Sequence, residues 1–437
     1  MSVVKASNVY KVFGKRQKEV VKRLEEGADR DDLTKLGTAA VIDASFEVEA
    51  GEIFVVMGLS GSGKSTLIRT LNGLWAPTTG SVEVLGTDIA KIDAAALRKV
   101  RSEHISMVFQ HFALLPHRTV RDNASYALEI RGTEKAKRDE VADRWLKAVG
   151  LEGWGDKYPE QLSGGMQQRV GLARALAAET DILLMDEAFS ALDPLIRREM
   201  QEQLVELQGE LKKTIIFITH DLNEAMFLGD RIAVMRNGRI VQVGTPEEIL
   251  TDPANDYVAQ FVHDVDRARV LTASNVMEKA RQVVTNQNGP RVALRNMRES
   301  NASAIYVTDR HRRFLGVVSD RDCIDHLRNG GNTLDEIIQP MTTSASPEDL
   351  LIELFLPSSE TPLPVPVTND DGHLVGVVPR ATLLAALGNQ NGDGEQTTHD
   401  DANLEWTAPV DTGLIDQILA ETDDASETGA ASGRGDL

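Results

Sequence analysis

Residues 58–66 carry the feature that most limits what this chain can fold into. They read GLSGSGKST and fit the pattern G-x-x-x-x-G-K-[ST]. Residues 52–57 before them form a short apolar run typical of a buried strand, and residues 66–72 after them have helical character. A strand, a glycine-rich turn and a helix in this order predict a loop whose backbone N–H groups surround a phosphate. In such a loop Lys64 reaches the β- and γ-phosphates of a nucleotide, and the Ser65 hydroxyl binds Mg²⁺.

Composition excludes several classes of protein. The chain has 437 residues, too many for one hydrophobic core, so we expect roughly two to four domains. A net charge of −20 argues against nucleic acid as a partner, because neutralising phosphates needs clustered Lys and Arg. The single cysteine, Cys323, rules out an internal disulfide and fits a reducing compartment. No window reaches the ~18 consecutive apolar residues of a membrane span, and residues 1–6 lack the apolar segment of a signal peptide.

The negative charge is concentrated at the C-terminal end. Residues 388–437 hold twelve Asp or Glu against one Arg, a net charge of −11, and Trp406 is their only aromatic residue. Segments of low hydrophobicity and high net charge bury too little apolar surface to fold. We therefore expect an acidic, disordered tail over residues 389–437.

Apolar runs alternate with helical segments through the first 260 residues. Strand patterns cover residues 52–57, 104–110, 181–187 and 214–219, with helical patterns between them. This alternation predicts an α/β fold with a largely parallel sheet. Residues 15–36 interrupt two strands. They are charged and mostly helical, with Val20, Val21 and Leu24 on one face, which is typical of a surface helix.

Six motifs in one order and spacing carry a family resemblance. They are the loop at residues 58–66, Gln110, the run LSGGM at residues 162–166, the pair Asp186 and Glu187, Asp193, and His220. Together they resemble the ATP-binding cassette (ABC) ATPases over about residues 3–260. The resemblance implies a P-loop ABC ATPase domain with a helical subdomain, which binds ATP and Mg²⁺ and hydrolyses the nucleotide.

The resemblance also implies a role for each motif residue. Glu187 would be the general base, His220 would contact the γ-phosphate, and Gln110 would sense Mg²⁺ and the attacking water. The metal would be held by Ser65, Gln110 and Asp186. The nucleotide would be bound by Phe13, Gly58, Ser60, Gly61, Ser62, Gly63, Lys64, Ser65, Thr66, Ser163, Gly164, Gly165 and Asp193. Phe13 is expected to stack on adenine; Tyr10 is the alternative aromatic, and core packing is the alternative role for Phe13.

Ser163, Gly164 and Gly165 are expected to serve a different nucleotide from Lys64. In ABC ATPases this signature loop covers the γ-phosphate that is bound by the opposite subunit. The site is then complete only in a head-to-tail dimer. Because this chain carries one cassette, the resemblance implies pairing with a second copy of the chain or with a paralogue.

Two segments in the second half repeat at an offset of 60 residues. Residues 304–318 parallel residues 364–378, and each segment continues into a helical pattern at 320–328 or 380–387. Strand, turn, strand, helix in such a unit resembles a tandem pair of CBS domains, an α+β module. The adenosine-site pattern of that family, Gly-x-x-[Ser/Thr]-x-x-Asp, is present in the first copy as Gly316, Ser319 and Asp322. The second copy departs from it, with Gly376, Pro379 and Thr382. One nucleotide site is therefore expected at most, and a dimerisation module without a ligand is the alternative.

A basic turn lies in the first copy, where residues 310–313 read Arg-His-Arg-Arg. Such a cluster in an acidic chain is either a solvated turn or a docking point for anionic lipid or for the acidic tail.

An ABC ATPase joined to tandem CBS domains resembles the ATP-binding subunits of glycine betaine/proline betaine importers. The resemblance implies ATP-driven uptake of an osmoprotectant through integral membrane permease subunits, with a periplasmic or surface substrate-binding protein. The ATPase would lie peripherally on the cytoplasmic face of the membrane. An importer of another small solute is the alternative, since selectivity resides in the other subunits. A repair or translation ATPase is disfavoured because no second cassette is present. A CBS regulator with an inactive cassette is disfavoured because Glu187 is present.

The predicted domains are an ABC cassette at 1–265, two CBS domains at 266–330 and 331–388, and the acidic tail at 389–437.

Overall fold

The computed structural model describes residues 2–388, apart from His111, Phe112, Ala191, Asp264, Thr342, Thr361 and Pro362. The chain divides into two compact units, Met1–Val265 and Asp266–Leu437. The tail predicted at 389–437 lies outside the described residues, so its predicted disorder stays a prediction.

The first unit is built on a six-stranded sheet in the order β10-β9-β3-β8-β7-β6. The five strands from β9 to β6 are parallel to their neighbours, and β10 runs antiparallel to β9. This confirms the predicted α/β fold with a largely parallel sheet. The strands are β3 Ile53–Met57, β6 Ile105–Val108, β7 Ile182–Asp186, β8 Thr214–Thr219, β9 Arg231–Arg236 and β10 Arg239–Gly244.

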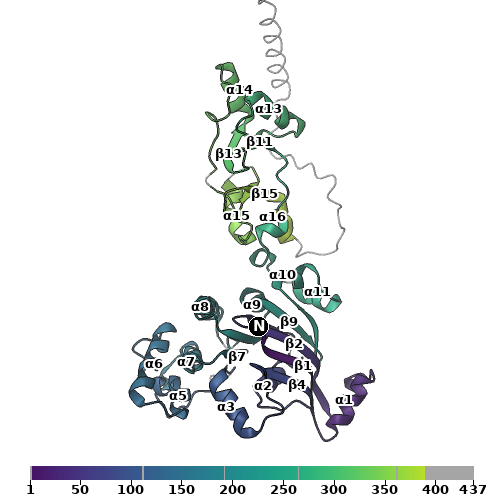
Figure 1. The fold of residues 1–437 in the computed structure, drawn as a ribbon, viewed down its shortest axis with the longest axis vertical. Coiled ribbons are helices and arrows are strands. Elements are labelled where there is room, and N and C mark those ends of the chain that lie inside the picture. Colours follow the sequence, from purple (N-terminus) through teal and green to yellow (C-terminus); the bar gives the residue numbers. More distant parts are fainter. Residues whose placement is uncertain are drawn as a thin grey trace, which may run out of the picture. The chain divides into compact units, whose positions relative to one another are not determined.

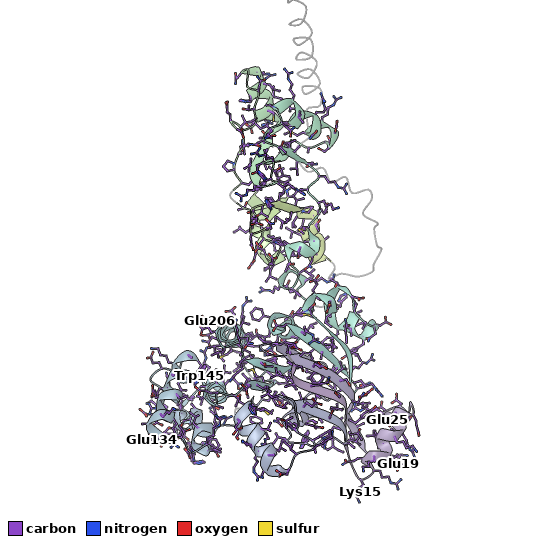
Figure 2. The ribbon with its side chains drawn as sticks, in the orientation of Figure 1. Lys15, Glu19, Glu25, Glu134, Trp145 and Glu206 are labelled. Atoms are coloured by element: carbon purple, nitrogen blue, oxygen red, sulfur yellow. The ribbon has the colours of Figure 1, made fainter. Side chains whose placement is uncertain are left out.

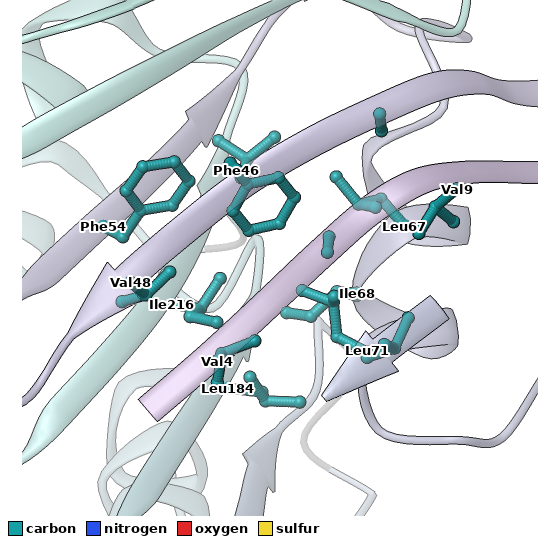
Figure 3. Packing of buried hydrophobic residues seen from close by; sticks show 14 of the residues in the cluster. Val4, Val9, Phe46, Val48, Phe54, Leu67, Ile68, Leu71, Leu184 and Ile216 are labelled. Atoms are coloured by element: carbon teal, nitrogen blue, oxygen red, sulfur yellow. The ribbon is translucent and has the colours of Figure 1, made fainter. Parts of the chain in front are cut away.

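A second, antiparallel sheet in the order β2-β1-β4-β5 lies against the first (Figure 1). Its strands are β1 Ser2–Phe13, β2 Thr38–Glu49, β4 Thr79–Val84 and β5 Thr87–Asp88. One hydrophobic cluster joins both sheets and the helix after the glycine-rich loop (Figure 3). Phe46 of β2 stacks on Phe54 of β3 with ring centroids 5.1 Å apart. The strand that leads into the glycine-rich loop is therefore packed against the second sheet through Phe54 and Val56.

The helix predicted at residues 66–72 is α2, and further helices lie between the strands, as the alternating pattern predicts. Figure 1 shows α5, α6 and α7 gathered on one side of the unit, with α1 on the opposite side. The helices are α1 Gln17–Glu25, α2 Lys64–Leu71, α3 Ala94–His104, α4 Val120–Ala124, α5 Tyr126–Ile130, α6 Lys135–Ala148, α7 Gly164–Ala177, α8 Pro194–Leu211, α9 Leu222–Leu228, α10 Pro246–Thr251 and α11 Asp256–Val262. Short 3₁₀ turns are η1 Asp31–Leu33 and η2 Pro159–Gln161.

The charged segment between β1 and β2 forms α1 and η1, as its pattern predicts. Val20, Val21 and Leu24 are buried, and they pack with Tyr10 and Val12 of β1 in a small separate core. The charged side chains of the segment point outward, as Lys15, Glu19 and Glu25 do in Figure 2. The segment thus adds a small core beneath the end of β1, the strand that carries Phe13.

The second unit contains the repeat that the sequence predicts. Each copy has two antiparallel strands followed by a helix, β12-β13-α14 in the first and β14-β15-α16 in the second. Its elements are η3 Arg267–Arg269, α12 Ala273–Val276, β11 Val283–Thr285, α13 Pro290–Glu299, β12 Ala304–Thr308, β13 Phe314–Ser319, α14 Asp320–Arg328, α15 Leu351–Glu360, β14 Val365–Thr368, β15 Leu374–Val378 and α16 Arg380–Gly388.

The two repeats are interlocked by their leading segments. Glu278, ahead of the first repeat, pairs with Val377 of β15, and Gln339, ahead of the second, pairs with Val317 of β13. Gly316 of β13 faces Gln339, and Gly376 of β15 faces Glu278. A Cβ at Gly316 would meet the Gln339 carbonyl oxygen at 2.3 Å, so only glycine admits the crossing segment there.

Candidate nucleotide site

The glycine-rich loop joins β3 to α2, as predicted. Gly58 and Gly63 have φ values of +150° and +106°, and a Cβ at either would lie within 2.2 Å of a backbone carbonyl oxygen. Glycine is required at both positions. Ser60 and Gly61 are exposed at the tip of the loop, and Thr66 lies in the first turn of α2. The hydroxyl of Ser62 is buried without a hydrogen-bond partner among the described residues, which suits a loop built to surround a ligand.

Lys64 is folded back over this loop. Its side chain is 4% exposed, and Nζ donates hydrogen bonds to the carbonyl oxygens of Gly58 at 2.7 Å and Leu59 at 3.2 Å. Burial lowers the pKa of Lys64, and the nearby carboxylates of Glu187 and Asp186 act against that shift. A cation held among backbone groups in this way is placed to accept an anion.

An oxygen-rich pair lies next to the loop, at the end of β7. The Ser65 hydroxyl donates to Asp186 Oδ1 at 3.0 Å. Burial raises the pKa of Asp186, while the Ser65 hydrogen bond and the Arg69 guanidinium 3.7 Å from Oδ2 lower it. A hydroxyl and a carboxylate in contact are ligands of the kind that Mg²⁺ prefers, so the residues present fit that ion. Sequence reasoning missed Arg69, although its place one helical turn after Ser65 was a usable signal.

Three predicted catalytic side chains meet at one carboxylate oxygen. Glu187 Oε2 accepts a hydrogen bond from Gln110 Nε2 at 3.0 Å and lies 3.4 Å from His220 Nδ1. Glu187 has a φ of +46°, and its N–H donates to the carbonyl oxygen of Ile218 in the adjacent strand. A non-glycine residue in this left-handed region is held there by its surroundings. Gln110 lies two residues beyond β6, which ends at Val108 rather than at the glutamine as the sequence suggested.

The sheet register explains why these side chains converge. Met57 of β3 lies beside Thr219 of β8, and Asp186 of β7 lies beside Ile218. The carboxyl ends of these three parallel strands therefore meet at one edge, where ligands bind in open α/β sheets.

The two candidate aromatic residues differ in exposure. Phe13 ends β1 and is 37% exposed, whereas Tyr10 is 6% exposed in the small core beneath α1. A buried ring has no face to offer a base, so the alternative of Tyr10 stacking on adenine is disfavoured. Phe13 does not sit in that core, and Lys11 Nζ lies 5.1 Å from its ring centroid.

Ser163, Gly164 and Gly165 line a cavity of about 550 Å³. Ser163 caps α7 by accepting a hydrogen bond from the Met166 N–H at 3.3 Å. Asp193, which caps α8, lines the same cavity, and no residue of the glycine-rich loop does so within the described ranges. The structure therefore brings Asp193 together with the signature loop rather than with Lys64.

In the second unit the adenosine-pattern residues have structural contacts. Asp322 Oδ2 accepts hydrogen bonds from the Ser319 hydroxyl at 2.6 Å and from Gln339 Nε2 at 2.8 Å. Ser319 caps α14, and Gly316 admits the crossing segment. The pattern thus supports the interlocked fold, and a nucleotide site there stays a prediction.

Fold and site together define a P-loop ATPase of the ATP-binding cassette class. Residues 41–190 match the family described as ABC transporter, and residues 273–329 match the family described as CBS domain. The chain belongs to the family of ABC transporter ATP-binding proteins with a C-terminal CBS module, and the relatives below are members. Within the described part of the chain, no helix has the length and apolar character needed to cross a bilayer.

Three curated relatives align with this chain over nearly their whole length. The glycine betaine/carnitine transport ATP-binding protein of Listeria monocytogenes serotype 1/2a (strain 10403S) is 49% identical, over 89% of this chain and 99% of its own. The glycine betaine transport ATP-binding protein of Bacillus subtilis (strain 168) is 48% identical, over 90% and 96%. The glycine betaine/proline betaine transport system ATP-binding protein of Escherichia coli (strain K12) is 47% identical, over 87% and 96%.

Proposed function

We propose that this chain is the ATP-hydrolysing subunit of an importer for glycine betaine or proline betaine. The observation that carries the ATPase role is the meeting of Gln110 and His220 at Glu187, beside the pair formed by Ser65 and Asp186. The substrate class comes from the names of relatives that match this chain over almost their full length.

The residues divide the chemistry among them. Lys64 and the loop N–H groups bind the β- and γ-phosphates, and Ser65 and Asp186 hold Mg²⁺, which supplies charge neutralisation there. Glu187 accepts a proton from the attacking water, with Gln110 and His220 orienting its carboxylate. Phe13 stacks on adenine. Two copies of the chain assemble head to tail, so that Ser163, Gly164, Gly165 and Asp193 complete the partner's site.

In the assembled transporter the chain lies peripherally on the cytoplasmic face of the membrane, against integral permease subunits. These subunits receive solute from a periplasmic or surface binding protein.

The name of one further relative supports a second candidate for the transported solute. The trimethylamine N-oxide transport system ATP-binding protein of Ruegeria pomeroyi (strain ATCC 700808 / DSM 15171 / DSS-3) is 50% identical over 62% of this chain. Uptake of labelled glycine betaine, proline betaine and trimethylamine N-oxide into vesicles holding the whole transporter decides between them.

Lys64→Ala is expected to weaken ATP binding by about 10- to 100-fold, because charge-assisted hydrogen bonds contribute about 1.5–3 kcal/mol each. The dissociation constant is measured by calorimetric titration of the purified chain. Lys15→Ala is the matched control, since this lysine points outward from the segment between β1 and β2 (Figure 2). An unchanged dissociation constant in Lys64→Ala would remove the lysine from the phosphate site.

We also propose that the CBS unit regulates the ATPase through ionic strength. Arg310, Arg312 and Arg313 are exposed on a turn held by Asp309, whose carboxylate accepts the N–H groups of His311 and Arg313. These backbone hydrogen bonds lower the pKa of Asp309, and the one from the Arg313 N–H has the largest effect. The basic turn is a fixed surface feature that can dock on anionic lipid, on the acidic tail, or on both.

The structure also brings an acidic turn next to the basic one. The Phe314 N–H donates to the Gly372 carbonyl oxygen, and the Leu374 N–H donates to the Arg312 carbonyl oxygen. The neighbouring turn therefore carries Asp370 and Asp371 beside the arginines. Sequence reasoning missed this partner, because it depends on how the repeats meet.

Replacing Arg310, Arg312 and Arg313 by alanine is expected to activate the transporter at lower salt. Three basic groups near an anionic surface contribute about 3 kcal/mol, and salt removes this as the Debye length falls from ~10 Å at 0.1 M to ~3 Å at 1 M. ATPase activity is titrated against KCl for the whole transporter in anionic liposomes. Two further variants are titrated in the same way. One is the double variant Asp370→Asn/Asp371→Asn, and the other is a chain ending at Gly388. Superimposable curves for all variants would contradict the proposal; a shift in the truncated chain alone would assign the sensor to the tail.

A further inference from the structure

Residues 75–78 are fastened to the last residues of β1. The Thr78 N–H donates to the Tyr10 carbonyl oxygen at 2.7 Å, and Lys11 Nζ donates to the Ala76 carbonyl oxygen at 2.8 Å. Residues 72–74 join them to α2, the helix that begins with Lys64. One continuous segment therefore runs from the phosphate-binding loop back to the strand end where the base is proposed to bind.

Trp75 is the aromatic residue of this segment, and its ring has two partners, Phe13 and Arg69. Its ring meets the Phe13 ring edge to face, with centroids 5.1 Å apart and planes 83° apart. The Arg69 guanidinium lies 5.1 Å from the Trp75 ring centroid, and Arg69 also pairs with Asp186 at 3.7 Å. The Trp75 N–H donates to the Arg69 carbonyl oxygen at 3.0 Å, which fixes the backbone of the tryptophan beside α2.

Simple core packing does not account for this placement. Trp75 is half-buried and belongs to neither of the hydrophobic clusters that its neighbours join. Its ring contacts are instead the half-exposed Phe13 and a guanidinium that reaches the acidic end of β7. An edge-to-face aromatic pair restrains both rings, and a cation over a ring face restrains it further.

We propose that Trp75 is a positioning residue of the nucleotide-base site. It holds the Phe13 ring in the orientation that receives the base, and Arg69 holds Trp75 in turn. Base binding then depends on a residue 62 positions away from Phe13 in the chain. An aromatic pair of this kind contributes about two- to tenfold in an equilibrium constant. This inference rests on the proposed placement of the base at Phe13.

The test separates the base from the phosphates. ATP and inorganic tripolyphosphate are titrated against the full chain without Mg²⁺, so that no hydrolysis occurs. The variants are Trp75→Leu, Trp75→Phe and Phe13→Leu, and Trp145→Phe on α6 is the matched control. We expect Trp75→Leu to weaken ATP binding about fivefold and to leave tripolyphosphate binding unchanged, while Trp75→Phe keeps most of the ATP affinity.

Tryptophan fluorescence gives a second reading. ATP, but not tripolyphosphate, should change the emission of the wild type and of Trp145→Phe, and this change should be lost in Trp75→Phe. A parallel loss of ATP and tripolyphosphate binding in Trp75→Leu would overturn the inference, as would unchanged ATP binding. If Phe13→Leu weakens ATP binding and Trp75→Leu does not, only the role of Trp75 fails. If neither substitution has an effect, the placement of the base at Phe13 fails as well.

Discussion

Glu187→Gln is expected to bind ATP with near wild-type affinity and to hydrolyse it about 10²–10⁴-fold more slowly. The glutamine keeps the size of the side chain and an oxygen that can accept the Gln110 hydrogen bond, which spans 3.0 Å in the wild type. It loses the basicity needed to take a proton from water. Release of phosphate by the purified chain measures the rate, and calorimetric titration measures the affinity.

If hydrolysis opens the proposed head-to-tail dimer, the same variant should accumulate as a closed dimer with ATP. Size-exclusion chromatography with and without ATP detects this state. Glu206→Gln is the control, since Glu206 is an exposed carboxylate of α8 (Figure 2). Hydrolysis at the wild-type rate in Glu187→Gln would remove this residue from its role as general base.

Ser163→Arg is expected to retain ATP binding and to lose turnover. The arginine would extend into the cavity of about 550 Å³ that Ser163 lines, and the partner's nucleotide could then not enter it. Ser163→Ala separates this effect from loss of the helix cap, which typically costs about 1 kcal/mol. Normal turnover in Ser163→Arg would show that the signature loop does not serve the opposite subunit.

A mixture of two inactive variants tests the same arrangement more sharply. In a mixed dimer of Ser163→Arg and Lys64→Ala chains, one composite site has an intact lysine from the first chain and an intact serine from the second. The other site carries both substitutions and is expected to bind ATP about 10- to 100-fold more weakly, so at limiting ATP the intact site is the one that is filled. ATPase activity should reappear on mixing, and no recovery would favour a site confined to one chain.

Local motifs predicted much of the site, because several follow directly from a strand, as the glycine-rich loop follows β3 and His220 follows β8. The pattern of residues 58–66 predicted β3 and α2, and the apolar runs that lead to Glu187 and His220 predicted β7 and β8. Contacts between distant segments were not predictable. The pairing of Phe13 with Trp75 and the position of Asp193 beside Ser163 depend on tertiary packing, which leaves no periodic or spacing signal in the sequence.

The exchange of leading segments between the two repeats has a consequence for how this half of the chain can change. A version cut after residue 329, where the CBS match ends, would lack Gln339 and leave one edge of β13 unpaired. Exposed strand edges invite aggregation. Deletions in this region should therefore be tolerated only when both repeats are removed together. A destabilising change in either repeat should lower the solubility of the whole second unit.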